Sequence, residues 1–327
     1  MKRKSSFVGI GASLGMLILI LDGKTAIAGG REGLELCLKT VIPSLFPFFL
    51  LSNLLTSAFA GGKIPLLRPL AFLCGVPAGG ESLLITGFLG GYPVGAQAVA
   101  SVFRSGQLSK DEAERMLAFC NNAGPAFLFG MAAAMFPQKG MVFILWLIHI
   151  LGALFTAVLI PTKDMHPVTL SEAKSVTISE AMYSAIRVMG SVCSWVILFR
   201  VLIGFLNRWV LWLLPIPVKV LITGLLELTN GCCALASISS IPMRFVLCAG
   251  MLAAGGLCVT MQTISVTAGL SLKYYLLGKV MQILFSLILS CAWVAKIFPP
   301  VLTAMLLFVL ILRKSKKSYS IQPIGGV

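Results

Sequence analysis

Charged residues are scarce in this chain of 327 residues. They make up 11% of the sequence, whereas 58% of the residues are hydrophobic and the mean hydropathy is +0.97. So little charge excludes a soluble domain with an ordinary polar surface. Apolar runs of about 20 residues, the length that crosses a hydrocarbon core of ~30 Å, recur along the whole sequence. The sequence therefore predicts an all-α, polytopic transmembrane helical bundle with about ten spans and no sizeable soluble domain.

The groups on which most enzymes rely are also scarce. The chain has two histidines, and its eleven acidic residues include three aspartates. It contains no G-x-S-x-G, H-E-x-x-H, P-loop or dinucleotide-binding motif, and its nine cysteines form no C-x-x-C pair. We therefore expect a protein that is not an enzyme and has no catalytic residue, metal site or cofactor. An enzyme that acts on a lipid-linked precursor is a distant alternative.

The net charge of +15 reflects membrane topology rather than a nucleic-acid partner. Basic residues gather at both ends of the chain and between the apolar runs, and Lys and Arg mark the cytoplasmic ends of membrane spans. Both termini are therefore expected in the cytoplasm, and the number of crossings is expected to be even. The terminal basic residues are Lys2, Arg3, Lys4, Arg313, Lys314, Lys316 and Lys317.

Polar links divide the sequence into five segments. They are an N-terminal transmembrane segment with an interfacial link (1–40), a first membrane repeat (41–160), a polar linker (161–183), a second membrane repeat (184–298), and a last span with a basic cytoplasmic tail (299–327). Residues 7–21 favour a first transmembrane helix over a cleaved signal peptide, although Ala26-Ile27-Ala28 resembles a signal-peptidase site. Ser109 and Glu112 have the spacing of a capping box and predict a helix start. Residues 206–230 fit either a kinked span or a loop.

The motif GG-x-x-V-x-x-Q occurs twice, each time inside an apolar segment and shortly before a polar break. Inside a helix, glycine costs roughly 1 kcal/mol and proline about 3 kcal/mol relative to alanine. Each copy therefore favours a broken helix whose free backbone groups face a ligand or a cavity. Close helix packing through small residues is an equally strong interpretation. The candidate binding residues of the two copies are Gly90, Gly91, Tyr92, Pro93 and Gln97, and Gly255, Gly256 and Gln262.

Glu81 and Glu227 are the acidic residues that stand in otherwise apolar, glycine-rich sequence. A carboxylate at membrane depth costs about 3 kcal/mol on insertion scales unless it is protonated, paired or bound to a cation. Both are therefore candidate proton, sodium or solute sites, and Thr229 and Asn230 add hydrogen-bonding groups beside Glu227. The competing interpretation pairs each carboxylate with Arg200, Lys219 or a helix N-terminus.

Asn121 and Asn122 interrupt another apolar stretch, just before Gly124-Pro125. Their amides are candidates for binding a polar solute, as are those of Gln97 and Gln262, with pairing between helices as the competitor. His149 lies within an apolar span. A neutral, hydrogen-bonded histidine is favoured there over a proton relay.

Weak correspondences between residues 41–160 and 184–298 suggest two related halves. With ten crossings, the first glycine motif runs outward and the second inward, so the halves would form an inverted pair. Inverted repeats with interrupted helices near the midplane are the architecture of many secondary transporters.

Six stretches occur in an order that matches a known family. They are P-S-L-F-P-F from Pro43, G-x-x-G-G-Y-P-V-G-A from Gly87, N-N-A-G-P from Asn121, the span around His149, G-L-L-E-L-T-N-G from Gly224, and A-G-G-L-C-V-T-M-Q from Ala254. On these motifs the chain resembles the bacterial sporulation integral membrane protein family, whose members carry nucleoside-recognition (Gate) domains. The resemblance covers roughly residues 35–295.

The resemblance implies a multi-pass protein of the cytoplasmic membrane of a spore-forming bacterium, in the forespore or the mother cell. It suggests that a nucleoside-like or other small polar solute is handled. With the two glycine motifs, Glu81 and Glu227, the leading hypothesis is a permease for such a solute or for a monovalent cation. The runner-up is a non-transporting scaffold needed to assemble the spore envelope or cortex. Besides the lipid bilayer, a second copy of the chain is a candidate partner, because glycine-rich faces pack between chains as readily as within one.

Overall fold

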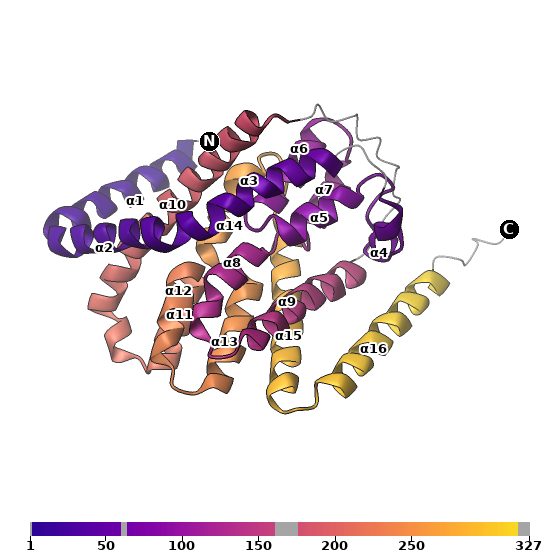
Figure 1. The fold of residues 1–327 in the computed structure, drawn as a ribbon. Coiled ribbons are helices and arrows are strands. Elements are labelled where there is room, and N and C mark those ends of the chain that lie inside the picture. The colour runs from indigo at the N-terminus through magenta and orange to yellow at the C-terminus, as the bar shows by residue number, and fades with distance from the viewer. Residues whose placement is uncertain (1, 60–63, 161–175, 320–327) are drawn as a thin grey trace.

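The computed structural model describes residues 2–59, 64–160 and 176–319, and these residues form helices joined by turns (Figure 1). Most of the predicted polar linker, residues 161–175, and the end of the basic tail, residues 320–327, lie outside the described residues. The helices are α1 (Lys2–Leu21), α2 (Gly23–Leu36), α3 (Ile42–Phe59), α4 (Arg68–Leu73), α5 (Glu81–Leu89), α6 (Val94–Arg104), α7 (Lys110–Leu117), α8 (Pro125–Gly130), α9 (Lys139–Leu159), α10 (Ile178–Trp209), α11 (Ile216–Leu226), α12 (Leu228–Ala234), α13 (Ile241–Ala254), α14 (Gly256–Val266), α15 (Lys273–Val294) and α16 (Phe298–Tyr319).

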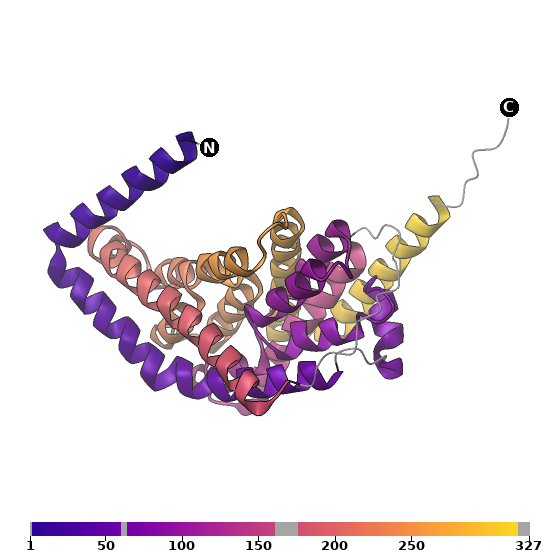
Figure 2. The same cartoon turned by 90° about the horizontal axis from the view of Figure 1, so that it is seen from above.

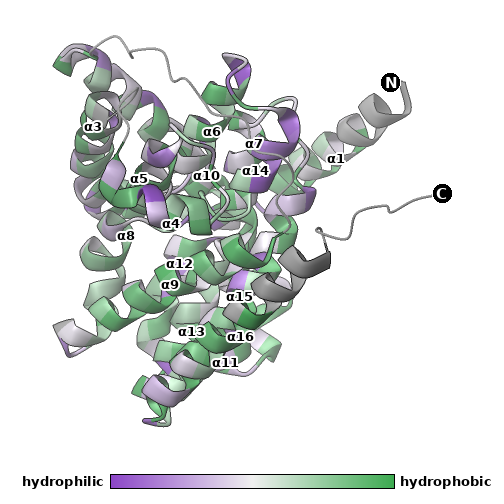
Figure 3. Ribbon diagram, turned by 90° about the vertical axis from the view of Figure 1, so that its right-hand side faces the viewer, coloured by the Kyte–Doolittle hydropathy of each residue, from purple (hydrophilic) through white to green (hydrophobic). Residues whose placement is uncertain are grey.

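Several helices are long and apolar enough to cross a membrane. Within the described residues five stretches meet this criterion, 23–55, 140–159, 178–209, 241–266 and 273–294, and three shorter apolar helices cover 9–21, 216–226 and 298–309. Hydrophobic residues cover most of the outer helices (Figure 3). The chain is therefore a helical membrane protein. The predicted count of about ten crossings and the inverted repeat stay predictions.

Among the described residues four helical stretches are interrupted, and at three of them the pieces are too short to count as long spans. The interruptions separate α5 from α6 at residues 90–93, α7 from α8 at 118–124, α11 from α12 at Glu227, and α13 from α14 at Gly255. Gly91 and Gly255 have φ angles of 76° and 70°, in the left-handed region that glycine adopts without a steric penalty. The prediction that both glycine motifs break their helices is confirmed.

Long helices surround these interruptions. α2 continues through a π-helical turn, Cys37–Val41, into α3, and α2 packs along α10. On the other side, α15 packs between α9 and α13. Seen from above, α1 and α16 extend away from this body at opposite ends (Figure 2). The short helices on either side of the interruptions therefore pack among long helices.

Local signals placed several helix ends correctly. Ser109 Oγ accepts a hydrogen bond from Glu112 N, and Ser109 N donates one to the Glu112 carboxylate, so the predicted capping box is confirmed. Between 206 and 230, a short connection follows the end of α10 at Trp209. The helix α11 then begins at Ile216, directly after Pro215. The second membrane repeat is predicted to begin at residue 184, whereas the helix in this region begins earlier. α10 starts at Ile178, where Thr177 and Glu180 form another capping box.

Candidate functional site

The four interruptions lie together, because glycines at each of them allow the backbones to touch. A Cβ added to Gly124 would lie 2.9 Å from the Cα atom of Gly91, so the breaks after α5 and after α7 are in contact. A Cβ added to Gly256 would lie 2.9 Å from the carbonyl oxygen of Gly224, which joins the α13 break to α11. A Cβ on Gly231 would overlap the Cα atom of Gly224, so α11 and α12 touch as well. Only glycine fits such positions without separating the helices.

Tyr92 links the two glycine motifs directly. Its hydroxyl donates a hydrogen bond of 2.9 Å to the carbonyl oxygen of Leu252, in the last turn of α13. A Cβ on Gly255 would lie 3.3 Å from the end of the Tyr92 ring. The two copies of GG-x-x-V-x-x-Q, which are far apart in the sequence, therefore meet through this side chain.

A small cavity of about 40 Å³ lies where the breaks meet, and we call it the inner cavity. It is mostly apolar, with walls that include Phe49 of α3 and Val196 of α10. Six of the residues singled out from the sequence line it, and they come from both glycine motifs and from the start of α12. They are Gly90, Gly91, Tyr92, Glu227, Thr229 and Gln262.

Glu227 is the carboxylate of the inner cavity and is 2% exposed. It is the N-cap residue of α12: one carboxylate oxygen accepts from Thr229 N at 3.0 Å, and the other from Asn230 N and Asn230 Nδ2, each at 2.7 Å. The helix N-terminus favours the negative charge. Among the described residues, no lysine, arginine or histidine forms an ion pair with Glu227. These contacts fit the helix N-terminus of the competing interpretation, and the charge is held by the dipoles of that terminus and of the Asn230 amide.

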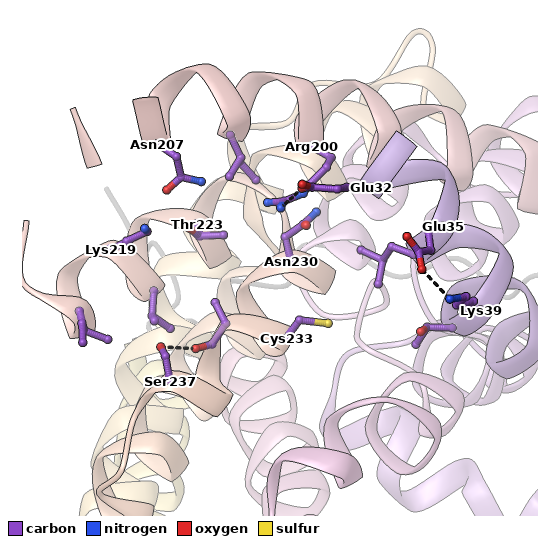
Figure 4. A pocket seen from close by; sticks show the side chains of 16 residues that line it. Glu32, Glu35, Lys39, Arg200, Asn207, Lys219, Thr223, Asn230, Cys233 and Ser237 are labelled. Carbon is purple, nitrogen blue, oxygen red and sulfur yellow. Dashed lines mark hydrogen bonds and ion pairs between the residues drawn. The ribbon is translucent and has the colours of Figure 1, made fainter. Parts of the chain in front are cut away.

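A larger pocket of about 660 Å³, which we call the outer pocket, opens between α2, α10, α11 and α12. Its walls carry the ion pairs Arg200–Glu32 and Lys39–Glu35, together with Lys219 (Figure 4). Asn230 lines the outer pocket, whereas Glu227, to which it is hydrogen bonded, lines the inner cavity. The hydrogen-bonded Asn230–Glu227 pair therefore contacts both spaces, one residue on each.

Glu81 lies elsewhere and is held differently. It begins α5, is 2% exposed, forms an ion pair of 3.1 Å with Arg68, and accepts a hydrogen bond from Gly79 N. It lines neither the inner cavity nor the outer pocket. Its surroundings fit the paired-carboxylate interpretation, although with Arg68 in place of the partners named from the sequence.

Asn121, Asn122 and His149 form a buried polar cluster at the break between α7 and α8, and we call it the polar cluster. Asn121 Nδ2 donates to Thr263 Oγ1 at 2.9 Å, and Asn122 Nδ2 donates to the carbonyl oxygens of Gly87 and Phe119. His149 Nε2 accepts from Ala123 N at 3.0 Å, so that nitrogen carries no proton. These contacts agree with the neutral-histidine interpretation and with amides that satisfy the backbone at the α7 break.

Pro93 and Gln97 do not line the inner cavity. Pro93 is buried at the start of α6, and Gln97 is half-buried on the same helix. Gln262 lines the inner cavity, and its Nε2 donates to Cys258 Sγ. The matched glutamines of the two motifs therefore occupy different surroundings, whereas their glycines play matching parts as helix breaks.

Two central residues of the polar cluster, Lys279 and Gln282, were not predicted from the sequence as candidate site residues. Lys279 Nζ donates to the carbonyl oxygen of Asn121 at 2.8 Å, and Gln282 Nε2 donates to Asn122 Oδ1 at 3.0 Å. The signal that could have found them is a stripe of polar residues along the apolar helix α15. Lys279, Gln282, Ser286 and Ser290 recur every three or four residues, which places them on one face.

A search against known proteins gives one informative similarity. Over 132 residues, which are 39% of this chain, the sequence is 35% identical to the sporulation integral membrane protein YlbJ of Bacillus subtilis (strain 168). The chain spans about a third of that relative, 32% of its length. No family model matches the sequence, and no solved structure matches the fold. The similarity supports the resemblance to sporulation integral membrane proteins, while a Gate domain and nucleoside recognition stay predictions.

Proposed function

We propose that this protein is a permease of the bacterial cytoplasmic membrane that admits a small polar solute or a monovalent cation to the inner cavity. The observation that carries the proposal is the convergence of four interrupted helices around a buried carboxylate, Glu227, that has no cationic partner among the described residues. The similarity to a sporulation integral membrane protein supports a role in spore formation.

The chemistry of the inner cavity suits a ligand with a positive charge or with hydroxyl and amine donors. Glu227 supplies a carboxylate, Thr229 a hydroxyl, and Gln262 an amide oxygen that receives no hydrogen bond from another described residue. A buried carboxylate is costly, and a bound cation or hydrogen-bond donor lowers that cost. These oxygens therefore favour such a ligand over an anion.

The size of the inner cavity supports a closed conformation. A volume of about 40 Å³ accommodates a few waters or a monovalent cation, and a nucleoside-like solute needs far more room. The outer pocket, at about 660 Å³, is large enough for such a solute. In our proposal the solute enters the outer pocket and passes when the Asn230–Glu227 contact opens.

Uptake into proteoliposomes tests the proposal, with ³H-uridine and ²²Na⁺ as the two probes. We expect the wild type to take up at least one of them, and Glu227→Gln to lose most of that uptake. Glu81→Gln is the matched control, because it removes another buried carboxylate that lies outside both spaces. Its uptake per folded protein should stay close to that of the wild type.

The scaffold alternative predicts a different pattern. A wild type that neither binds nor moves either probe, together with normal sporulation of a strain that carries Glu227→Gln, would leave only the scaffold. Equal loss of uptake in Glu227→Gln and Glu81→Gln would mean that both carboxylates act through folding, and would remove Glu227 from the proposed site.

A further inference from the structure

Lys279 is a buried amino group that has no carboxylate partner in the part of the chain that the structure describes. It is 5% exposed, and its Nζ donates to Asn121 O at 2.8 Å, to Gln282 Oε1 at 3.3 Å and to Tyr92 Oη at 3.4 Å. The same nitrogen lies 4.9 Å from the centre of the Tyr92 ring and 5.6 Å from that of Tyr275. Three neutral acceptors and two ring faces therefore surround the lysine.

The titratable groups that face Lys279 supply no compensating negative charge. They are Tyr92, Tyr275 and His149, and the last is unprotonated at Nε2. Of the helices packed against α15, α9 and α16 contribute no described carboxylate near the lysine, and α13 carries Arg244, which donates to the carbonyl oxygens of Ile238 and Met135.

The charged residues of α7 contact other parts of the structure. Glu114 accepts from Ser271 N, about two turns before Lys279, and Arg115 donates to the carbonyl oxygens of Cys74, Gly75 and Ala157. The other charged residues of this helix lie earlier still, and they are Lys110, Asp111 and Glu112. Lys279 forms no ion pair with any described residue. An ammonium in such a place is held only by hydrogen bonds and ring faces, so losing its proton removes a desolvation cost.

The hydrogen bonds around Lys279 fit the protonated state and change when the proton leaves. An ammonium has three donors, which match the three acceptors, and Tyr92 is then free to donate to Leu252 O at 2.9 Å. A neutral amine has two donors and one lone pair. The Tyr92 hydroxyl is the donor next to that lone pair, and turning toward Lys279 would release the carbonyl of Leu252.

Releasing Leu252 would loosen the contact between the two glycine motifs. Leu252 lies three residues before Gly255, where α13 is interrupted, and Tyr92 also forms a wall of the inner cavity. The proton on Lys279 is thus linked, through one side chain, to the packing of the helix breaks around Glu227.

We propose that Lys279 is a proton-binding site, and that the proton it binds and releases is the coupling ion of this protein. The proposal rests on the permease function above and names its coupling ion. In the release step the Nζ–H bond of the ammonium breaks, the proton passes to water admitted as the breaks separate, and the freed lone pair accepts the Tyr92 hydroxyl. Rebinding reverses these changes.

The flux test uses proteoliposomes loaded with the pH dye pyranine, a clamped membrane potential, and ³H-uridine or ²²Na⁺ as probe. For one proton moved with each uridine, a gradient of one pH unit should give about tenfold accumulation. Lys279→Gln should equilibrate the probe without accumulation and without moving protons. Lys273→Gln, on the exposed start of the same helix, is the matched control and should behave as the wild type.

A second measurement needs no flux. Hydrogen exchange of the amides of residues 251–257 in nanodiscs, corrected for the intrinsic effect of pH, should speed up between pH 6 and pH 9.5 in the wild type. In Lys279→Gln it should be the same at both values. Should Lys279→Gln fail to fold, Tyr92→Phe tests the same link, because it removes the hydroxyl that joins Lys279 to Leu252.

The outcomes separate the two proposals. Proton-driven accumulation that persists in Lys279→Gln overturns the proton site and leaves the permease function standing. A wild type that moves neither probe, yet shows exchange that depends on both pH and Lys279, overturns the permease function and retains the proton site. Exchange that ignores pH in a wild type that moves neither probe removes both, whereas the same exchange with uptake but without accumulation overturns the proton site alone.

Discussion

The close backbone contact between α11 and α12 can be tested by adding a single methyl group at Gly231. A Cβ there would overlap the Cα atom of Gly224, lie 2.7 Å from its nitrogen and lie 3.3 Å from Met251 Sδ. Optimal contacts between such atoms are about 3.5–4.0 Å, so α11 and α12 would have to separate by roughly 1.5–2 Å. Overpacking of this kind typically costs about 1–3 kcal/mol, and contact with rigid backbone favours the upper part of that range.

Gly190→Ala provides the matched control for Gly231→Ala. Gly190 is exposed on α10, and a Cβ there would meet nothing within 4 Å. Because alanine is the better helix former, this variant should be more stable by about 0.5–1 kcal/mol. The assay is thermal unfolding in detergent, followed by intrinsic fluorescence. At about 2–4 °C for each kcal/mol, we expect Gly231→Ala to melt several degrees below the wild type and Gly190→Ala slightly above it.

Gly231→Ala should also affect the site itself. Glu227 caps α12 through Thr229 N and Asn230 N, so moving α12 away from α11 would shift the donors that hold the carboxylate. We therefore expect probe uptake to fall more than the loss of folded protein explains. Equal melting temperatures for Gly231→Ala and Gly190→Ala would refute the inference that backbone contact between α11 and α12 holds the breaks together.

Three further substitutions test contacts that hold individual helices in place. Arg115→Met should destabilise the protein by about 3 kcal/mol or more in thermal unfolding, because it leaves the buried carbonyls of Cys74, Gly75 and Ala157 without this donor; a loss below 1 kcal/mol would contradict that role. Arg68→Met should cost more stability than Arg68→Lys, because it leaves the Glu81 carboxylate buried without its cation; equal costs would mean that the ion pair contributes little. Thr177→Ala should cost about 1 kcal/mol through loss of the N-cap of α10, with hydrogen exchange of residues 178–181 as the readout; unchanged exchange there would contradict the cap.

Three of the four helix breaks described above, all but the one at Glu227, were predictable from the sequence because their causes are local. Glycine at Gly91 and Gly255 allows the left-handed backbone, and Pro125 supplies a first-turn residue for α8 after the paired asparagines. The Ser109 capping box depends on two residues that are three positions apart, so it could also be predicted from the sequence. Such features need no knowledge of distant contacts.

The contacts between breaks were not predictable in detail, because they depend on packing between distant segments. Nothing near Tyr92 indicates that its hydroxyl reaches Leu252, 160 residues later. Lys279 escaped notice because a basic residue near the start of an apolar run is normally taken as an interfacial anchor. The usable signal was the polar stripe on α15 that begins at Lys279. Such a stripe identifies the polar surface of the helix, but it does not identify the residues that contact this surface.

Glu81 and Glu227 show how two similar sequence environments acquire different roles. Each stands at the start of a short, buried helix, and each is 2% exposed. Arg68 neutralises Glu81, so a second cation is not needed there. Glu227 has backbone amides and the Asn230 amide, which stabilise a negative charge without cancelling it. An uncancelled carboxylate at the edge of a cavity is the one of the two that still gains free energy by binding a cation or a hydrogen-bond donor, so the inner cavity at Glu227 is where a ligand should be sought first.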